Sequence, residues 1–243
     1  YENYYPGFDY SSNSRLTKAI DQVFELKSVI RSIKESNVSL WKSITDKLIL
    51  DWTYNSNAIE GSKLALEETR FFLQTGLTVE GKPLKDFLDA RNHFEAVEYL
   101  FEIIRQERAI STSVLKEFNA LLLSGIASTP ALDQFGRQTS KPATPGEYKK
   151  NPNHVVQTDG TIHRYADPIH VPDEMEFLCR WIEDQRGALH PAIIASVAHY
   201  NFVRIHPFDD GNGRGARILM NLILMQSGFL PTVIKNEQRR QYI

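Results

Sequence analysis

One stretch of the sequence combines residue types that suit phosphate chemistry. IHPFDDGNGRGAR (205–217) holds a histidine, two aspartates, glycines and two arginines, and an apolar helical pattern follows it. Glycines let a backbone approach a phosphate closely, and the exposed N–H groups at a helix start complement its charge. Arg214 and Arg217 lie on one side of the first turn, where two cations are unfavourable until an anion binds. The stretch therefore predicts a polyphosphate site.

Two other side chains of this stretch suit a phosphoryl-type transfer. His206 can accept a proton near neutral pH, and Asp210 could hold a magnesium ion shared with phosphate oxygens. The sequence has no GxxxxGK[ST] motif, so this is not an ordinary P-loop. Two alternatives stay open: a solvated Asp-Gly-Asn-Gly turn, and a calcium loop, although the twelfth position counted from Asp209 is Met220 and not glutamate.

A second stretch poses an electrostatic question at the end of an expected helix. Apolar spacing over 40–59 predicts a helix that stops at Gly61, with Glu60 at its negative end. A carboxylate there costs about 0.3–1 kcal/mol unless a cation is near it. We therefore ask which cation Glu60 meets.

Apolar spacing predicts helices along most of the chain. Besides the helix at 40–59, they are expected over about 20–33, 66–73, 87–104, 114–122, 175–182, 194–203 and from 213 or 214 onward. Between 126 and 172 this pattern fails, and only 154–157 and 161–165 look extended, with the hairpin signal Asp159-Gly160 between them. A single hairpin has no sheet to join, so we interpret it as a flap.

Composition narrows the class of protein. With 243 residues and 42% hydrophobic side chains, the chain can bury a substantial core, which argues against disordered and fibrous classes. Its 28 basic and 30 acidic residues are interspersed, which argues against a broad nucleic-acid surface. The most apolar run, 218–225, is too short to span a bilayer, and the single cysteine, Cys179, reads as a core residue. We expect a soluble, cytoplasmic protein without a membrane partner.

The stretch HPFDDGNGRGAR resembles the signature of the Fic family, HPFx(D/E)GNGRxxR, and meets every specified position. The resemblance covers most of the chain, through IEGSKLALEET, PGEYKKNP and AHYNFVRIHPF, although Lys149 stands where the family more often has arginine. It implies a mainly α fold, a Fic-type helical bundle with a small β-hairpin flap. Residues 1–62 would form an N-terminal helical region with the inhibitory motif at 56–61. Residues 63–243 would form the Fic domain, with the flap at about 150–168 and the catalytic motif at 206–217.

The resemblance also implies an activity: magnesium-dependent transfer of AMP from ATP to Ser, Thr or Tyr hydroxyls of a target protein. His206 would be the general base, Asp210 would bind Mg²⁺, and Asp209, at the variable position, would be solvated. Tyr242 would line the adenine pocket. The ATP phosphates would be bound by Gly211, Asn212, Gly213, Arg214 and Arg217, with Arg217 nearest the γ-phosphate.

Residues 56–61, SNAIEG, match the inhibitory motif of the family, (S/T)xxxE(G/N). By that resemblance Ser56 and Glu60 are regulatory, and Glu60 pairs with Arg217 where the γ-phosphate needs to bind. The carboxylate at a helix end and the arginine near a helix start would then be each other's partner, and the resting protein would be weakly active.

Partners and rival functions stay open. A target protein would dock on the flap hairpin by pairing an extended segment with its strand edge, and the chain itself is a second target to consider. The oligomeric state is also open. The same site could use another phosphate-containing donor or remove AMP from a modified protein. The non-enzymatic rival is a helical scaffold that binds peptides.

Overall fold

The computed structural model describes residues 5, 11–132, 137–156 and 161–243. Its helices are α1 (Ser14–Ser36), α2 (Val38–Ile59), α3 (Leu66–Thr75), α4 (Leu84–Arg105), α5 (Thr112–Leu122), α6 (Val171–Asp184), α7 (Pro191–Ile205), α8 (Asn212–Gln226) and α9 (Arg239–Tyr242), with short 3-10 turns at η1 (Pro168–His170) and η2 (Asn236–Gln238). The strands are β1 (Ser128–Leu132), β2 (Gln138–Pro142), β3 (Val155–Val156) and β4 (Ile162–His163). The prediction of a mainly helical fold with a small hairpin is confirmed.

The helices begin and end where local chemistry favours it. Asn37 separates α1 from α2, and its side chain caps α2 by accepting a hydrogen bond from the Leu40 N–H at 2.9 Å. Gly76 ends α3 in the left-handed conformation, at φ 73°, which glycine adopts without steric cost. Pro191 is the first residue of α7, where its missing N–H leaves no hydrogen bond unmade.

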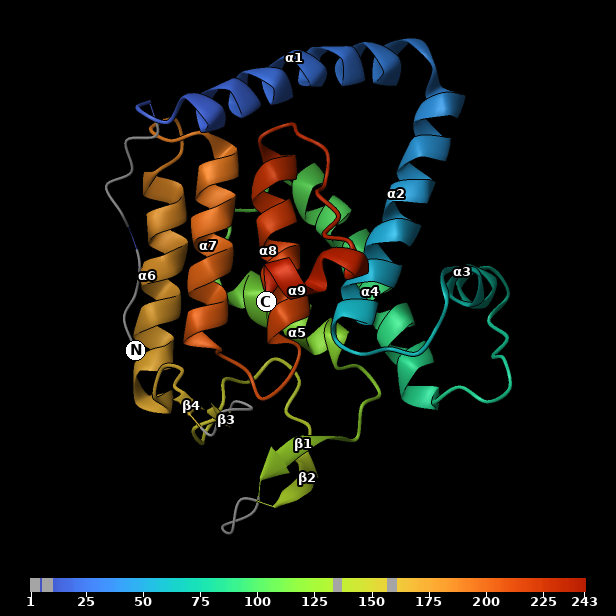
Figure 1. Cartoon of the computed structure of the whole chain (residues 1–243), viewed down its shortest axis with the longest axis vertical. Helices are drawn as coiled ribbons and strands as arrows, with labels where there is room; N and C mark the ends of the chain where they lie inside the picture. Colours follow the sequence, from blue (N-terminus) through green and yellow to red (C-terminus); the bar gives the residue numbers. More distant parts are fainter. Residues whose placement is uncertain (1–4, 6–10, 133–136, 157–160) are drawn as a thin grey trace.

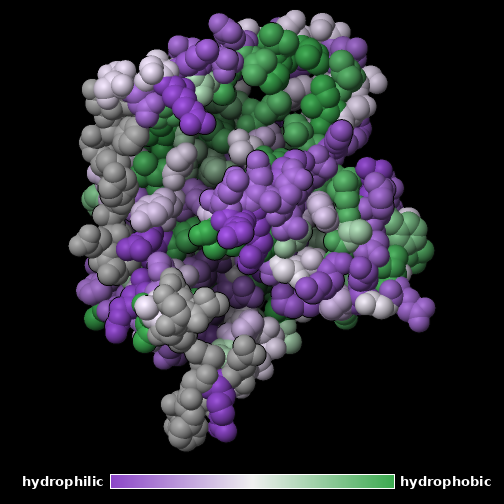
Figure 2. All heavy atoms as spheres, in the orientation of Figure 1, coloured by the Kyte–Doolittle hydropathy of each residue, from purple (hydrophilic) through white to green (hydrophobic). Residues whose placement is uncertain are grey.

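The elements form a bundle in which α6, α7 and α8 lie side by side, with α1 across one end and α2 descending along α4 and α8 (Figure 1). The Lys27 ammonium ties α1 to this end by donating to the Ser227 carbonyl at 2.7 Å. Figure 2 shows hydrophobic side chains around a hollow beneath α1, which has a volume of about 660 Å³. The arch of α1 and α2 therefore positions the end of α2 against α8.

The core is centred on α8. Its residues Ile218, Leu219 and Leu222 are fully buried and belong to one cluster with Leu100 of α4 and Phe202 of α7. Burying each such side chain contributes about 1.5–3 kcal/mol. The start of α8, where the predicted catalytic loop enters, is therefore held by this core.

Among the described residues, two antiparallel strand pairs, and not one, interrupt the helices. Strands β1 and β2 pair antiparallel from Ser128↔Pro142 to Leu132↔Gln138, so the expectation of a single hairpin between 126 and 172 was wrong. Polar residues and Pro130 hide the alternation that reveals a strand. The expected hairpin forms as β3 and β4, and its Asp159-Gly160 turn lies outside the described residues. Within the described part of the chain, no helix is long and apolar enough to cross a membrane.

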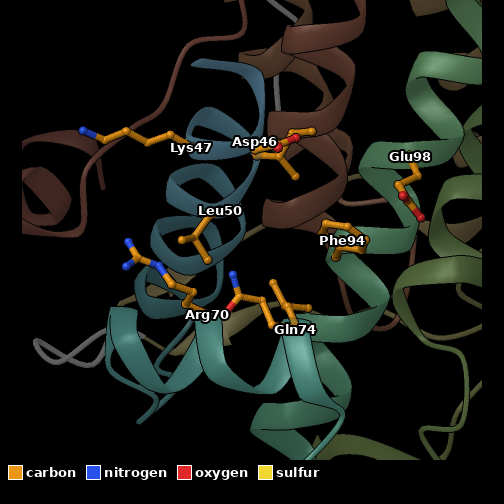
Figure 3. Close-up of a pocket in the computed structure, with 9 residues that line it drawn as sticks. Asp46, Lys47, Leu50, Arg70, Gln74, Phe94 and Glu98 are labelled. Atoms are coloured by element: carbon orange, nitrogen blue, oxygen red, sulfur yellow. The ribbon is translucent and has the colours of Figure 1, made fainter. Parts of the chain in front are cut away.

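A further hollow, of about 510 Å³, lies between α2, α3 and α4 (Figure 3). Leu50, Arg70 and Phe94 line it from these three helices in turn. None of the residues predicted to bind phosphate lines this hollow.

Candidate active site

The predicted catalytic loop, residues 206–211, joins two helix ends. His206 ends α7 in the left-handed conformation, at φ 51° and ψ 59°, and its N–H donates to the Phe202 carbonyl at 2.9 Å. Non-glycine residues adopt this conformation rarely, and it often marks a functional constraint. The chain then turns into α8 at Gly211, at φ 78°. His206 and the positive end of α8 therefore lie at the two ends of one short loop.

Asparagine side chains hold this loop in shape. Asn212 accepts from the Phe208 N–H at 2.9 Å and donates to the Phe208 carbonyl at 2.7 Å. Asn153 donates to the same carbonyl at 2.9 Å, and Asn119 donates to the Asp210 carbonyl at 3.0 Å. The Asn212 side chain is thus used to close the loop, which leaves its backbone N–H for an anion. Asn119 and Asn153 were not predicted from the sequence.

Lys149 is built into the floor beneath the loop. Its ammonium is buried and donates to the Asn153 side chain at 2.7 Å and to the Ile205 carbonyl at 3.3 Å, while its backbone N–H donates to the Pro207 carbonyl at 2.8 Å. Burial lowers the pKa of Lys149 to about 8. The lysine at this position therefore joins the base of the flap to the loop.

His206 has the protonation state that a general base needs. Its Nδ1 lies 3.3 Å from the Val203 carbonyl, which can only accept, so Nδ1 carries the hydrogen and Nε2 keeps a free lone pair. Burial lowers the pKa of His206 to about 4. The imidazole is therefore neutral at physiological pH and can take a proton at Nε2.

Glu60 meets Arg217. The carboxylate oxygen Oε1 lies 2.6 Å from Nη2 of Arg217, across 157 residues of sequence. The guanidinium, of which 2% is exposed, also donates to the Ser56 hydroxyl and to the Ser56 carbonyl, each at 2.9 Å. This ion pair supplies the cation that a carboxylate at the end of α2 requires.

The Glu60 carboxylate lies where an anion is expected at the start of α8. A Cβ atom added to Gly213 would be 2.2 Å from Glu60 Oε1 and 3.3 Å from Nη1 of Arg217. Glycine at this position therefore lets the carboxylate rest against the first helical turn, whose N–H groups have no intrahelical acceptor. Glu60 thus occupies part of the predicted phosphate cradle.

Arg214 has a partner that was not predicted. Its Nη1 lies 2.6 Å from Asp89 Oδ1 of α4, and 3% of its side chain is exposed. The other Asp89 oxygen accepts from the Lys85 ammonium at 2.6 Å. Arg214 Nε is buried and has no hydrogen-bond partner among the described residues. A row of polar residues at helical spacing on α4, Asp86, Asp89 and His93, is the signal that could have revealed this contact.

The two adjacent aspartates have different surroundings. Asp209 was expected to be solvated, but 7% of its side chain is exposed, and it pairs with the Lys141 ammonium at 2.5 Å and the Thr144 hydroxyl at 3.2 Å. Asp210 is more open, at 28% exposed, and accepts from the Gly211 N–H at 2.6 Å. Magnesium is usually held by one or two carboxylates, waters and substrate phosphates, so Asp210 fits such a role. No set of three metal-binding side chains clusters within the described residues.

Tyr242 contacts the same arginine. Its hydroxyl lies 3.2 Å from Arg217 Nη1 and 2.7 Å from His199 Nε2. Burial lowers the pKa of His199 to about 4, so this histidine is neutral at physiological pH. The predicted place of Tyr242 in an adenine pocket stays a prediction.

Residues 235–242, which we name the C-terminal clasp, lie along α2. Lys235 pairs with Asp51 at 3.2 Å, the Asn236 N–H donates to Asn55 at 2.9 Å, and Arg239 Nε donates to the Ile59 carbonyl at 2.8 Å. These three α2 residues are four positions apart and share one helical face. Figure 1 shows α9 in front of α8, and Figure 2 shows hydrophilic residues over it. The clasp thus contacts both the helix that carries Glu60 and, through Tyr242, its partner Arg217.

Comparison with known proteins gives consistent matches. The family model described as Fic/DOC family matches residues 109–224. The protein adenylyltransferase Fic of Drosophila mojavensis is 29% identical over 226 residues, which are 93% of this chain and 41% of that protein. The chain therefore spans about two fifths of the length of the curated relatives it matches.

Solved structures give the same result. A Fic domain containing signaling protein from Bacteroides thetaiotaomicron has 31% sequence identity and a TM-score of 0.78, over 92% of this chain and 78% of that one. Fic-1 from C. elegans has 26% identity and a TM-score of 0.73, over 96% of this chain and 65% of that one. The domain boundary between residues 62 and 63 stays a prediction.

Proposed function

This chain belongs to the Fic family, and we propose that it transfers AMP from ATP to hydroxyl side chains of a target protein, under inhibition by Glu60. One observation carries the proposal. A neutral histidine with a free Nε2 shares one short loop with a helix N-terminus that bears Arg214 and Arg217. A base and an anion site in one loop are what nucleotidyl transfer requires.

The proposed reaction follows from these groups. His206 Nε2 takes the proton from the target hydroxyl, whose oxygen attacks the α-phosphorus as the bond to the bridging oxygen of the β-phosphate breaks. Pyrophosphate leaves with the electron pair of that bond. The N–H groups of the first α8 turn and the two arginines stabilise its charge. Asp210 would hold a magnesium ion, which neutralises phosphate charge when bound.

Inhibition is proposed from the position of the Glu60 carboxylate. Because it lies against Gly213 and pairs with Arg217, it competes with a phosphate for the same N–H groups and the same guanidinium. ATP that enters beside it would lack its contact with Arg217, and its α-phosphorus would be misaligned for attack. The resting chain is therefore expected to be slow.

The first test of the proposed function is a comparison of two labels. Glu60→Gly is incubated with Mg²⁺ and a lysate, once with ATP labelled on the α-phosphate and once with ATP labelled on the γ-phosphate. Above the label found in the lysate alone, we expect protein-bound label only from the α-phosphate, and about a hundredfold less of it in Glu60→Gly/His206→Ala, because a general base contributes about 10²–10⁴ to the rate. Label from the γ-phosphate would instead indicate a kinase, and no label from either would refute AMP transfer from ATP.

The clasp provides a milder test of inhibition. Arg239→Ala removes the hydrogen bond to the Ile59 carbonyl, one residue before Glu60. Losing about 1 kcal/mol of hydrogen bonding favours release of the helix end, so we expect the basal rate to rise about two- to fivefold. Arg240→Ala is the matched control, since Arg240 is its exposed neighbour. An Arg239→Ala rate equal to that of the control would contradict a role of the clasp in inhibition.

A further inference from the structure

The flap contributes an aromatic ring to the catalytic loop. Tyr165, which follows β4, lies flat on the imidazole of His206: the ring centroids are 3.8 Å apart and the planes are inclined by 14°. Stacked rings at this distance are in van der Waals contact, so the imidazole cannot turn over without displacing the phenol ring. No motif in the sequence indicated this contact.

Other groups hold Tyr165 in this place. Its backbone N–H donates to His154 Nδ1 at 3.2 Å, across the hairpin. The His163 ring meets it edge-on with centroids 4.9 Å apart, and the Lys149 ammonium lies 5.9 Å from its ring centroid. The position of the ring is therefore set by the flap and the floor of the loop, independently of His206.

The imidazole is restrained on a second side as well. Its Nδ1 edge is tied to the Val203 carbonyl, while one of its faces is covered by Tyr165. A ring flip that exchanged the two nitrogens would break the first contact and disrupt the second. The two restraints together select Nε2 as the nitrogen that is presented to a substrate.

We propose that Tyr165 is a positioning residue for AMP transfer, whose ring, by stacking on His206, holds the imidazole in the orientation in which Nε2 takes the proton from the target hydroxyl. This inference rests on the proposed function. Tyr165 acts through His206 and not on the reacting atoms. Because Tyr165 follows β4, a target segment that pairs with the flap would also set the ring that orients the base.

The stack has a measurable electrostatic consequence. Burial lowers the pKa of His206 to about 4; the Val203 carbonyl raises it, and Lys149 and His163 lower it. Removing the phenol ring opens one face of the imidazole to water, so the pKa moves upward toward the ordinary value of about 6.5. The His206 imidazole would then become protonated, and could no longer act as a base, as the pH falls from about 7 to about 5. With the ring in place it stays neutral over that range.

The test compares Tyr165→Ala with Tyr165→Phe, which keeps the ring and removes only the hydroxyl. The histidine Cε1 signals of the intact chain are titrated by NMR, and His206 is identified by its missing signal in His206→Gln. We expect Tyr165→Ala to raise the His206 pKa by about one unit or more and Tyr165→Phe to keep it low. In the Glu60→Gly background, Tyr165→Ala should lower kcat at pH 6 by about tenfold or more with little change in KM for ATP, mainly because the imidazole is no longer held in the orientation for proton transfer, and Tyr165→Phe should keep most of the activity.

Each outcome bears on one claim. An unchanged His206 pKa and an unchanged pH profile in Tyr165→Ala would overturn the positioning role, and so would equal losses in the two variants, because the ring would then not matter. Tyr165→Leu, which keeps apolar cover but no ring, replaces the alanine variant if circular dichroism shows that the latter is misfolded. Absence of AMP transfer in the Glu60→Gly parent would refute the proposed function. The NMR titration would still show whether the Tyr165 ring lowers the pKa of His206.

Discussion

Glu60→Gly is expected to raise the initial rate of AMP transfer by about 100-fold over the wild type, because removing or restoring one group that stabilises transition-state charge changes rates by about 10²–10³. By the proposed function that group is Arg217, whose Nη2 is paired with Glu60 at 2.6 Å in the wild type. Glycine removes the competing carboxylate and leaves the contacts of Arg217 with Ser56 in place. The measurement is label transferred from the α-phosphate of ATP per minute at equal protein concentration.

Two further variants test whether Glu60 inhibits through its charge and through Arg217. Glu60→Gln keeps the volume beside Gly213 but not the charge, so its rate should lie between those of the wild type and Glu60→Gly. Glu60→Gly/Arg217→Ala should be as slow as the wild type or slower. Removing the Glu60 carboxylate cannot raise the rate when Arg217, the cation expected to bind the phosphates, is also absent. If this double variant is as fast as Glu60→Gly, inhibition does not act through Arg217.

The predicted catalytic loop could be located from the sequence because its residues are adjacent in the chain. The residues from His206 to Arg217 are contiguous, and the apolar period of α8 fixes where the loop must end. The ion pair of Glu60 with Arg217 joins distant parts of the chain and came from the family resemblance. The residues alone indicated only that a carboxylate at the end of α2 needed a cation.

The contacts that were missed are tertiary. Tyr165 reaches His206, and Asn119 reaches the loop, only once the flap and α5 are packed, and nothing in local periodicity encodes either contact. The error at Asp209 has the same origin. Its partner Lys141 belongs to β2, a strand whose polar, proline-containing hairpin has no period that distinguishes it from a loop. One missed hairpin therefore made a buried, paired carboxylate look solvated.

Asp89→Ala is expected to cause the largest loss of stability, about 3–5 kcal/mol of unfolding free energy, because it leaves the buried Arg214 guanidinium without its close partner. The nearest remaining carboxylate is Asp210, 3.9 Å from Nη2 of Arg214. Glu95→Ala is the matched control on the same helix. It removes the exposed pair of Glu95 with Arg91, which should cost about 0–1 kcal/mol. Urea unfolding of the intact chain at equal salt measures both.

The same experiment connects stability to the anion site. Arg214 binds a carboxylate in the resting chain and, by the proposed function, a phosphate of ATP in the working one. ATP with Mg²⁺ should therefore stabilise Asp89→Ala more than it stabilises the wild type, since the phosphates supply the charge that the carboxylate provided. Glu95→Ala should gain no more from ATP than the wild type does. Equal gains in all three chains would mean that Arg214 does not contact the nucleotide, and its pairing with Asp89 would then be purely structural.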